Sequence, residues 1–127
     1  MKKKSKRSVL IVDDSAFNLE LVKALITVEN DIDFIDACDG KEAVDKFVKF
    51  DPDLVILDIM MPNMGGVETL KIMKKTNDSI PIIILTAVEN EKTKKICLDL
   101  GVDGYFNKPL NNTKLSLLVK QLLAKAK

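Results

Sequence analysis

The sequence predicts an α/β fold in which a five-stranded parallel sheet is covered by helices on both faces, a doubly wound (βα)5 arrangement. Three observations predict it. Short apolar runs recur five times, segments with helical spacing lie between them, and the runs start 20 to 28 residues apart. That interval is the length of a strand, a crossover helix and two short loops. The runs cover 9–12, 34–37, 54–57, 82–85 and 104–106.

The strands expected at 9–12, 54–57 and 82–85 are continuous runs of Val, Ile and Leu rather than alternating patterns. Continuous runs are typical of parallel strands that are buried on both faces, and β-branched residues favour strand over helix. Pro52 and Pro81 precede two of these strands, at positions where a missing N–H costs little. These three strands are therefore expected in the interior of the sheet.

Apolar residues at helical spacing predict the crossover helices. The stripes are Phe17, Leu21, Leu25 and Val28 in the first helix, Val44, Phe47 and Val48 in the second, and Leu115, Leu118, Val119 and Leu122 in the last. A helix over 67–75 follows Gly65-Gly66, and one over 89–100 is expected to end at Gly101 in a left-handed cap. With 127 residues the chain fits one domain.

Cysteine usage and hydrophobicity limit the compartment. Cys38 and Cys97 form no metal-binding or redox pattern, so we expect both to be small buried side chains in a reducing compartment. No apolar stretch has the length of a signal-peptide core or of a transmembrane helix. The sequence therefore predicts a cytoplasmic protein that does not bind a membrane.

Charge is distributed unevenly between the amino terminus and the rest of the chain. Five positive charges lie in residues 2–7, and removing them from the net charge of +1 leaves −4 for the remainder. We expect a basic tail over 1–7 and one domain over 8–127. A basic tail on a mildly acidic body does not make a nucleic-acid-binding domain, so we expect no direct binding to nucleic acid.

Side chains able to do chemistry follow four of the five apolar runs. Asp13 and Asp14 follow the first run, Asp58 the third, Thr86 the fourth and Lys108 the fifth. Helix capping would explain one of the two paired aspartates but not both. Because parallel strands end at one edge of a sheet, these residues are expected to form a single site there.

The chemistry of such a site indicates a metal and a phosphoryl group. Like-charged carboxylates about 4 Å apart cost on the order of 4 kcal/mol per pair at an effective dielectric of about 20, so the cluster needs a cation. Oxygen ligands without His or Cys favour Mg²⁺. With Lys108 and Thr86 to hold phosphoryl oxygens, the set predicts an aspartate that attacks phosphorus.

Several short motifs occur in a characteristic order. They are Val12-Asp13-Asp14, Asp39-Gly40 with Glu42-Ala43, the stretch from Asp58 to Gly66, Leu85-Thr86-Ala87, and Tyr105-Phe106-Asn107-Lys108-Pro109. In this order and spacing they resemble the receiver domain of two-component response regulators over nearly the whole chain, in particular the chemotaxis-regulator-like single domains. The resemblance implies a flavodoxin-like sheet with the strand order 2-1-3-4-5.

The resemblance also implies a role for each carboxylate. Asp58 would be the phospho-acceptor. Asp14 would bind Mg²⁺ directly and Asp13 mainly through water, and the backbone carbonyl of Met60 would be a further ligand.

The remaining roles concern the phosphoryl group and the response to it. The resemblance implies that Thr86 and Lys108 bind the phosphoryl group and that Tyr105 is the switch aromatic. It also implies a cis peptide bond from Lys108 to Pro109.

As a function, the resemblance implies a phosphorylation-activated signalling switch that is no enzyme beyond its own phosphorylation and dephosphorylation. The chain contains no histidine, so the phosphoryl group is expected from a separate sensor histidine kinase or a phosphotransfer protein. The output face of the family is helix 4, strand 5 and helix 5. Here Lys92, Lys94 and Lys95 predict an acidic downstream partner, and a phosphorylation-dependent dimer stays open.

Three other functions are weighed against this one. A nucleotide- or flavin-binding module lacks support because neither GxxxxGK[ST] nor GxGxxG occurs. A haloacid-dehalogenase-like phosphatase needs an acid two positions after its nucleophile, where Met60 stands. A phosphorylation-independent receiver-like protein-binding module would be favoured by a lost site residue, and none is missing. Whether the chain is a single-domain regulator or part of a longer protein stays open.

Overall fold

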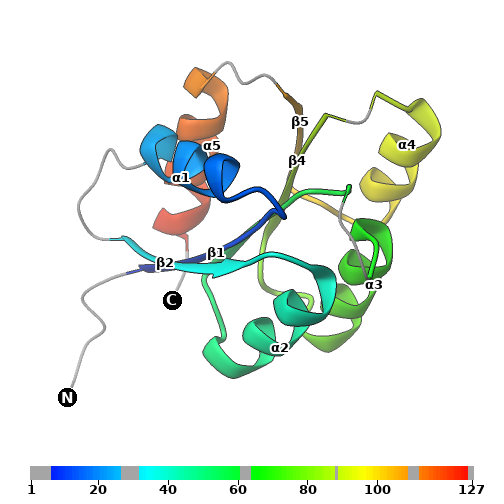
Figure 1. Cartoon of the computed structure of the whole chain (residues 1–127), viewed down its shortest axis with the longest axis horizontal. Coiled ribbons are helices and arrows are strands. Elements are labelled where there is room, and N and C mark those ends of the chain that lie inside the picture. The colour runs from blue at the N-terminus through cyan, green and yellow to red at the C-terminus, as the bar shows by residue number, and fades with distance from the viewer. Residues whose placement is uncertain (1–6, 27–31, 61–63, 88, 109–111, 126–127) are drawn as a thin grey trace.

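The computed structural model describes residues 7–26, 32–60, 64–87, 89–108 and 112–125. In these residues five strands alternate with five helices along the chain (Figure 1). The elements are β1 Arg7–Val12, α1 Ala16–Ile26, β2 Ile32–Ala37, α2 Gly40–Phe50, β3 Leu54–Leu57, α3 Gly66–Thr76, β4 Ile82–Thr86, α4 Glu91–Asp99, β5 Gly104–Asn107 and α5 Asn112–Ala124. Each predicted strand and helix is present, with ends that differ by a few residues.

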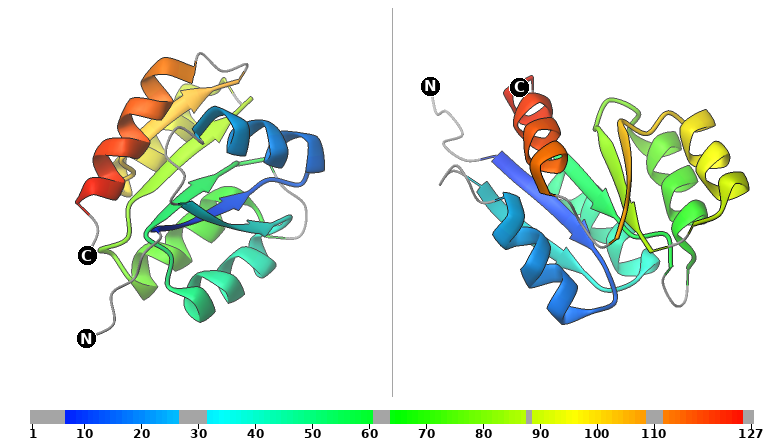
Figure 2. Two further views of the ribbon diagram at one scale, coloured as in Figure 1. Left: turned by 90° about the vertical axis from the view of Figure 1, so that its left-hand side faces the viewer. Right: turned by 90° about the horizontal axis from the view of Figure 1, so that it is seen from above.

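The strands form one parallel sheet in the order β2-β1-β3-β4-β5, which confirms the predicted fold and strand order. Helices α1 and α5 cover one face of the sheet, and α2, α3 and α4 lie on the other side (Figure 2). β1, β3 and β4 lie in the interior of the sheet, as their continuous apolar runs predicted.

Alternate residues of the central strands feed two separate cores. Leu10, Val55 and Ile84 point to the core that α2 and α3 cover, while Ile11 and Ile56 point to the core beneath α1 and α5. All five side chains are at most 1% exposed. This two-sided burial is why these strands show no polar positions in the sequence.

The buried face of α1 differs from the predicted one. Phe17 is 74% exposed and Leu21 is 43% exposed, whereas Leu19, Val22 and Ile26 are buried against the sheet. The helix carries apolar residues on two sides, so helical spacing identified the element but could not decide which side packs. Val28, also part of the predicted stripe, lies outside the described residues.

The prediction for one of the two cysteines is wrong. Cys97 in α4 is buried as expected, but Cys38 is exposed in the turn between β2 and α2. Its thiol donates a hydrogen bond to Glu42 Oε1 at 3.1 Å. A short polar turn offers no core to bury a side chain, and this could not be read from composition.

The end of α4 follows the predicted cap. Asn90 Oδ1 accepts the N–H of Thr93 at 3.1 Å where the helix begins. Gly101, just beyond its last residues, has a φ of 89° and confirms the left-handed conformation expected there.

In the described part of the chain, no helix is long and apolar enough to cross a membrane. The peptide bond to Pro109 and residues 1–6 of the predicted tail lie outside the described residues.

Candidate functional site

The ends of β1 and β3 bring two aspartates side by side. The N–H of Asp58 donates to Val12 O and that of Asp13 to Ala37 O, both at 3.0 Å, so each residue continues its strand's pairing by one position. Asp13 is 3% exposed and Asp58 is 6% exposed, while Asp14 beside them is exposed. Backbone pairing therefore fixes two carboxylates in a poorly solvated position.

Ser15 settles whether the aspartates merely cap α1. The N–H of Asn18 donates to Ser15 Oγ at 3.2 Å, so the serine caps the helix. The Ser15 N–H in turn donates to Asp13 Oδ1 at 3.0 Å. Neither aspartate is needed as a cap. The capping role of Ser15 was not predicted, although Ser before a helix is a strong capping signal.

Three carboxylates converge at the carboxyl edge of the sheet. One oxygen from each of Asp13, Asp14 and Asp58 lies within 4.8 Å of the others. Lys108 reaches the same point from the end of β5, with Nζ 2.6 Å from Asp13 Oδ2 and 3.2 Å from Asp58 Oδ2. Its backbone N–H donates to Thr86 O at 2.8 Å and places the residue just beyond the edge.

The pocket shifts the pKa of both Asp58 and Lys108. Burial raises the pKa of Asp58 and Asp13 raises it further, against the N–H of Met60 and the charge of Lys108, which lower it. Burial lowers the pKa of Lys108, but its hydrogen bond to Asp13 and the charges of Asp58 and Asp13 outweigh burial, so the pKa is raised. The pocket holds Lys108 charged and makes the negative charge on Asp58 costly.

The loop after β3 is held close to Asp58. The N–H of Met60 donates to Asp58 Oδ1 at 3.1 Å, and the Met60 side chain is 61% exposed. The N–H of Gly66 donates to Ile59 O at 3.0 Å. A Cβ at Gly66 would lie 2.3 Å from Ile59 Cα, so only glycine allows α3 to begin this close to the strand.

The donor set fits Mg²⁺. Three carboxylates around the Lys108 ammonium leave an excess of negative charge, and an ion bound here would meet oxygen ligands from Asp13, Asp14 and Asp58. Hard oxygen ligands that leave room for water are the environment that Mg²⁺ requires. The acidic triad is therefore consistent with the predicted cofactor.

The two remaining predicted residues lie further along the sheet. Thr86 ends β4, is wholly buried and pairs with Asn107 of β5. Tyr105 pairs with Ile84, is half-buried, and contributes to a hollow of ≈ 160 Å³ near the start of α4. Lys94 Nζ lies 5.7 Å from the centre of its ring.

The predicted residues therefore form a central group of four, with Thr86 and Tyr105 at outer positions. Asp13, Asp14, Asp58 and Lys108 meet directly, and the register places Thr86 next to Lys108 and Tyr105 one strand further out. Burial raises the pKa of Tyr105, and the charges of Cys97 and Glu91 raise it further. The pocket and the aromatic are thus linked through the ends of β4 and β5.

Comparison with known families gives one match that spans the chain: the model of the response regulator receiver domain matches residues 9–120. The chain belongs to this family. A curated relative, the chemotaxis protein CheY of Halobacterium salinarum, is 33% identical over 117 residues, which cover 92% of this chain and 97% of the relative. The transcriptional regulatory protein CpxR of Escherichia coli is 36% identical over 118 residues, which cover 93% of this chain and 50% of that protein.

Solved structures of receivers agree with the sheet. The crystal structure of the CheX-CheY-BeF3-Mg²⁺ complex from Borrelia burgdorferi is similar with a TM-score of 0.84 and 34% identity, covering 94% of this chain and 90% of that chain. The chain spans about half the length of transcriptional regulators such as CpxR and nearly the whole of CheY. It is a CheY-like receiver domain.

Family and site together define the function at the level of the domain. The receiver is a phosphorylation-activated switch of two-component signalling, with an acidic pocket formed by Asp13, Asp14 and Asp58. Membership of the receiver-domain family implies a histidine kinase as the partner of this domain.

Proposed function

We propose that Asp58 is the residue that accepts the phosphoryl group. The observation that carries the proposal is its place at the end of central strand β3, nearly buried and 3.2 Å from Lys108 Nζ. Asp13 is tied more tightly, because its oxygens accept from Ser15 N–H at 3.0 Å and from Lys108 Nζ at 2.6 Å. Asp14 is exposed and lacks this enclosure. Asp58 is therefore an enclosed carboxylate whose negative charge is costly and whose contact with Lys108 is longer than that of Asp13.

The reaction is an attack of an Asp58 carboxylate oxygen on phosphorus. A P–N bond to the histidine of the donor breaks, an acyl phosphate forms on Asp58, and the imidazole leaves with the electron pair. Lys108, held beside the carboxylates, would move its charge toward a phosphoryl oxygen, and the Thr86 hydroxyl would donate to another. When bound, Mg²⁺ supplies positive charge that neutralises the negative charge developing on the phosphoryl oxygens.

In the same pocket we propose the metal ligands that the resemblance implies. Asp14 and Asp58 would contribute carboxylate oxygens directly, Asp13 mainly through water, and Met60 its backbone carbonyl. This fits the 4.8 Å grouping of the three carboxylates. It also fits the position of Met60, whose N–H is already hydrogen-bonded to Asp58.

The signal would leave the pocket through β4 and β5. A phosphoryl group on Asp58 would draw Thr86 toward it, and Tyr105 would fill the space released, which biases a two-state equilibrium. The affected surface is α4, β5 and α5, where Lys92, Lys94 and Lys95 favour an acidic downstream protein or a phosphorylation-dependent second copy. Lys95 is 77% exposed although it pairs with Asp99 at 3.2 Å.

The proposal includes the setting of the domain. Residues 1–7 would be a basic tail and 8–127 the receiver, working in the cytoplasm without direct binding to nucleic acid or membrane. The phosphoryl donor would be a sensor histidine kinase or a phosphotransfer protein. The relative solved with BeF3 and Mg²⁺ supports the pairing of an anionic group with this metal.

Intact-mass spectrometry after incubation with acetyl phosphate and Mg²⁺ tests the acceptor. We expect one phosphoryl adduct on the wild type, no adduct on Asp58→Asn, and an unchanged adduct on Asp45→Asn, a surface aspartate whose side chain is 68% exposed. An adduct that persists in Asp58→Asn would disprove the assignment. No adduct on any folded protein would favour the phosphorylation-independent binding module instead.

Intrinsic fluorescence tests the switch separately. Tyr105 is the single tyrosine and the chain has no tryptophan, so tyrosine emission reports on this one ring. Beryllium fluoride with Mg²⁺, a tetrahedral phosphoryl mimic, should change its emission in the wild type and in Asp45→Asn but not in Thr86→Val. An identical response in Thr86→Val would remove Thr86 from the route.

A further inference from the structure

A hollow of ≈ 600 Å³ lies at the amino edge of the sheet, the end opposite to the acidic pocket. It is formed by the loops that lead into β3, β4 and β5 and by the end of α5. Its rim is acidic and its floor is partly apolar. The residues that matter are Asp51, Asp53 and Asp103 on the rim, Lys125 at one side, and Ile80 and Leu122 in the floor.

The acidic rim is held by the backbone. Asp103 Oδ2 accepts the N–H of Ile82 at 3.0 Å, which fixes the carboxylate at the start of β4. Asp51 stands at the end of α2 in a left-handed conformation with a φ of 48° and is exposed. Three aspartates against Lys125 give the hollow a negative balance.

The start of β1, which follows the amino-terminal tail in the sequence, lies beside this rim. Asp53 N–H donates to Ser8 O at 2.9 Å, and Ser8 N–H donates to Asp53 Oδ2 at 2.9 Å, so the start of β1 is joined directly to the hollow. Figure 2 shows the start of β1 at the same end of the molecule as the end of α5. Residues 2–6, immediately before Arg7, carry four lysines.

The reach of the tail matches the width of the hollow. From β1 to β5 there are three steps of about 4.8 Å between neighbouring strands, or roughly 15 Å. Five extended residues span at most roughly 17 Å. The lysines of 2–6 can therefore reach the whole rim from Asp53 to Asp103.

We propose that residues 2–6 dock in this hollow on the same molecule, with their lysines against the aspartates of the rim. Opposite charges favour the contact, and the covalent link to β1 supplies an effective concentration of the order of millimolar, so that weak contacts suffice. The hollow and the acidic pocket lie at opposite ends of the strands. A docked tail therefore leaves the phosphoryl pocket open while it withdraws four positive charges from other anionic partners.

Paramagnetic broadening in nuclear magnetic resonance spectra tests the contact on the full chain. A nitroxide is attached at Ser5→Cys in a Cys38→Ser background, where the remaining Cys97 is fully buried. We expect the amide signals of Ser79 and Asp103 in the hollow to lose intensity, while that of Thr93 on α4 keeps it. Salt at about 0.5 M should restore the lost intensity, because exposed charge pairs are then screened.

Two matched double variants separate the hollow from net charge. Asp51→Asn/Asp103→Asn should restore the intensity, and it should not disturb the fold, since asparagine tolerates the left-handed backbone and can still accept from Ile82. Asp45→Asn/Asp99→Asn removes the same charge from exposed sites and should leave the broadening unchanged.

Three results would overturn the proposal. The first is broadening confined to the neighbours of β1, and the second is broadening that survives Asp51→Asn/Asp103→Asn. The third is equal broadening when spin-labelled and isotope-labelled chains are mixed, which would assign the hollow to the tail of a second copy.

Discussion

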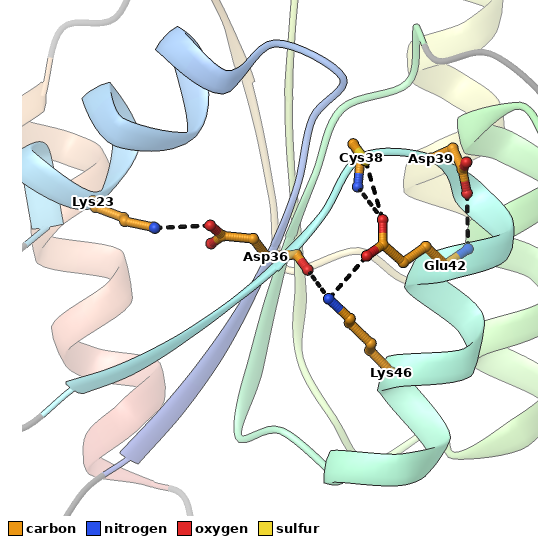
Figure 3. A network of polar contacts seen from close by, with 6 residues as sticks. All are labelled: Lys23, Asp36, Cys38, Asp39, Glu42 and Lys46. Carbon is orange, nitrogen blue, oxygen red and sulfur yellow. Dashed lines mark hydrogen bonds and ion pairs between the residues drawn. The ribbon is translucent and has the colours of Figure 1, made fainter.

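The acidic pocket at the ends of β1 and β3 and the polar network between β2 and α2 are built from the same two kinds of side chain, carboxylates and lysines. Figure 3 shows the network, which consists of Lys23, Asp36, Cys38, Asp39, Glu42 and Lys46. One carboxyl group in each cluster nevertheless has a shifted pKa, and the two shifts are opposite. The pKa of Asp58 in the pocket is raised, whereas that of Glu42 in the network is lowered to about 2.

The network supplies each of its carboxylates with at least one donor. Glu42 Oε1 accepts from the N–H of Cys38 at 2.9 Å, and its Oε2 lies 2.9 Å from Lys46 Nζ. Asp36 Oδ2 pairs with Lys23 at 2.9 Å, and Asp39 Oδ1 accepts the N–H of Glu42 at 2.8 Å (Figure 3). The N–H of Cys38 is the largest cause of the lowered pKa of Glu42, followed by Lys46 and the Cys38 thiol.

The pocket does the reverse by burying its carboxylates in a group. For Asp58 burial is the largest cause and outweighs the single N–H of Met60 and the charge of Lys108. The comparison teaches that donor supply and burial, rather than residue type, decide whether a carboxylate stabilises the fold or stores unfavourable charge. A site that binds a cation and a phosphoryl group needs carboxylates whose negative charge is not already neutralised by neighbouring donors.

Replacing Lys108 with Met should have the largest effect. It leaves Asp13 and Asp58 buried without their cation, and removing one partner of a buried ion pair typically costs roughly 3 kcal/mol or more of unfolding free energy. Urea denaturation at pH 7 without Mg²⁺ measures this. The control is Lys46→Met in the network, whose partly exposed pair should cost about 1 kcal/mol or less. Equal losses of unfolding free energy in the two variants would show that burial does not distinguish the pocket from the network.

Asp58→Asn should increase stability, the opposite of an ordinary substitution at a buried polar site. Because the folded pKa of Asp58 lies above its unfolded value, its contribution is fully present at low pH and is lost as pH rises through the folded pKa. Removing the charge should therefore raise the unfolding free energy at pH 7, because burial makes the charged form of Asp58 less favourable in the folded state than in the unfolded state. Denaturation from pH 3 to 8 without Mg²⁺ measures both the gain and the pH slope. A variant less stable than the wild type at pH 7 would show that Lys108 already compensates the pocket.

Mg²⁺ should stabilise the pocket and leave the network unaffected. A ligand that binds only the folded state raises stability by about 2.7 kcal/mol at one hundred times its dissociation constant. Thermal unfolding with Mg²⁺ or with a chelator should show this gain in the wild type and in Glu42→Gln, and a reduced gain in Asp14→Asn. Equal gains in wild type and Asp14→Asn would exclude that carboxylate as a ligand.

Glu42→Gln should lower stability, in contrast to Asp58→Asn. Its folded pKa of about 2 lies below the ordinary value of 4.5, so the stabilisation is present above about pH 4.5 and is lost as pH falls toward 2. The side chain is 36% exposed, so solvent screening limits the loss to about 1 kcal/mol or less. Acid denaturation curves of the variant and of the exposed control Glu68→Gln measure it. No difference between the two would mean that the network adds nothing measurable.

The smallest effect concerns the reactivity of Cys38. Its hydrogen bond to Glu42 is the largest cause of a raised thiol pKa, followed by the charge of Glu42. Because the thiolate is the reactive form, Cys38 should alkylate more slowly with iodoacetamide at pH 8 than in Glu42→Gln, as followed by intact mass. Cys97, which is buried, serves as the internal control. An unchanged rate in Glu42→Gln would show that the thiol does not depend on the network.

The fold could be predicted from the sequence, because the patterns that identify each strand and helix lie within a few neighbouring residues. Continuous apolar runs and helical spacing identify β1, β3 and β4 and the helices between them, and each strand's polar end is adjacent in sequence to its apolar run. Parallel topology then requires Asp13, Asp58 and Thr86 to meet at one edge. This much of the site follows from chain order and the geometry of a parallel sheet.

Which lysines neutralise which carboxylates depends on how the helices and strands pack, so it follows from the tertiary structure and not from the sequence pattern. The 2.6 Å contact of Lys108 with Asp13 joins residues 95 positions apart. The contacts of Lys23 with Asp36 Oδ2 and of Lys46 with Asp36 O depend on how α1 and α2 pack against β2. The exposed face of α1 at Phe17 is likewise set by its neighbours. Burial and donor supply are properties of packed elements, and they shift the pKa of the Asp58 and Glu42 carboxyl groups in opposite directions.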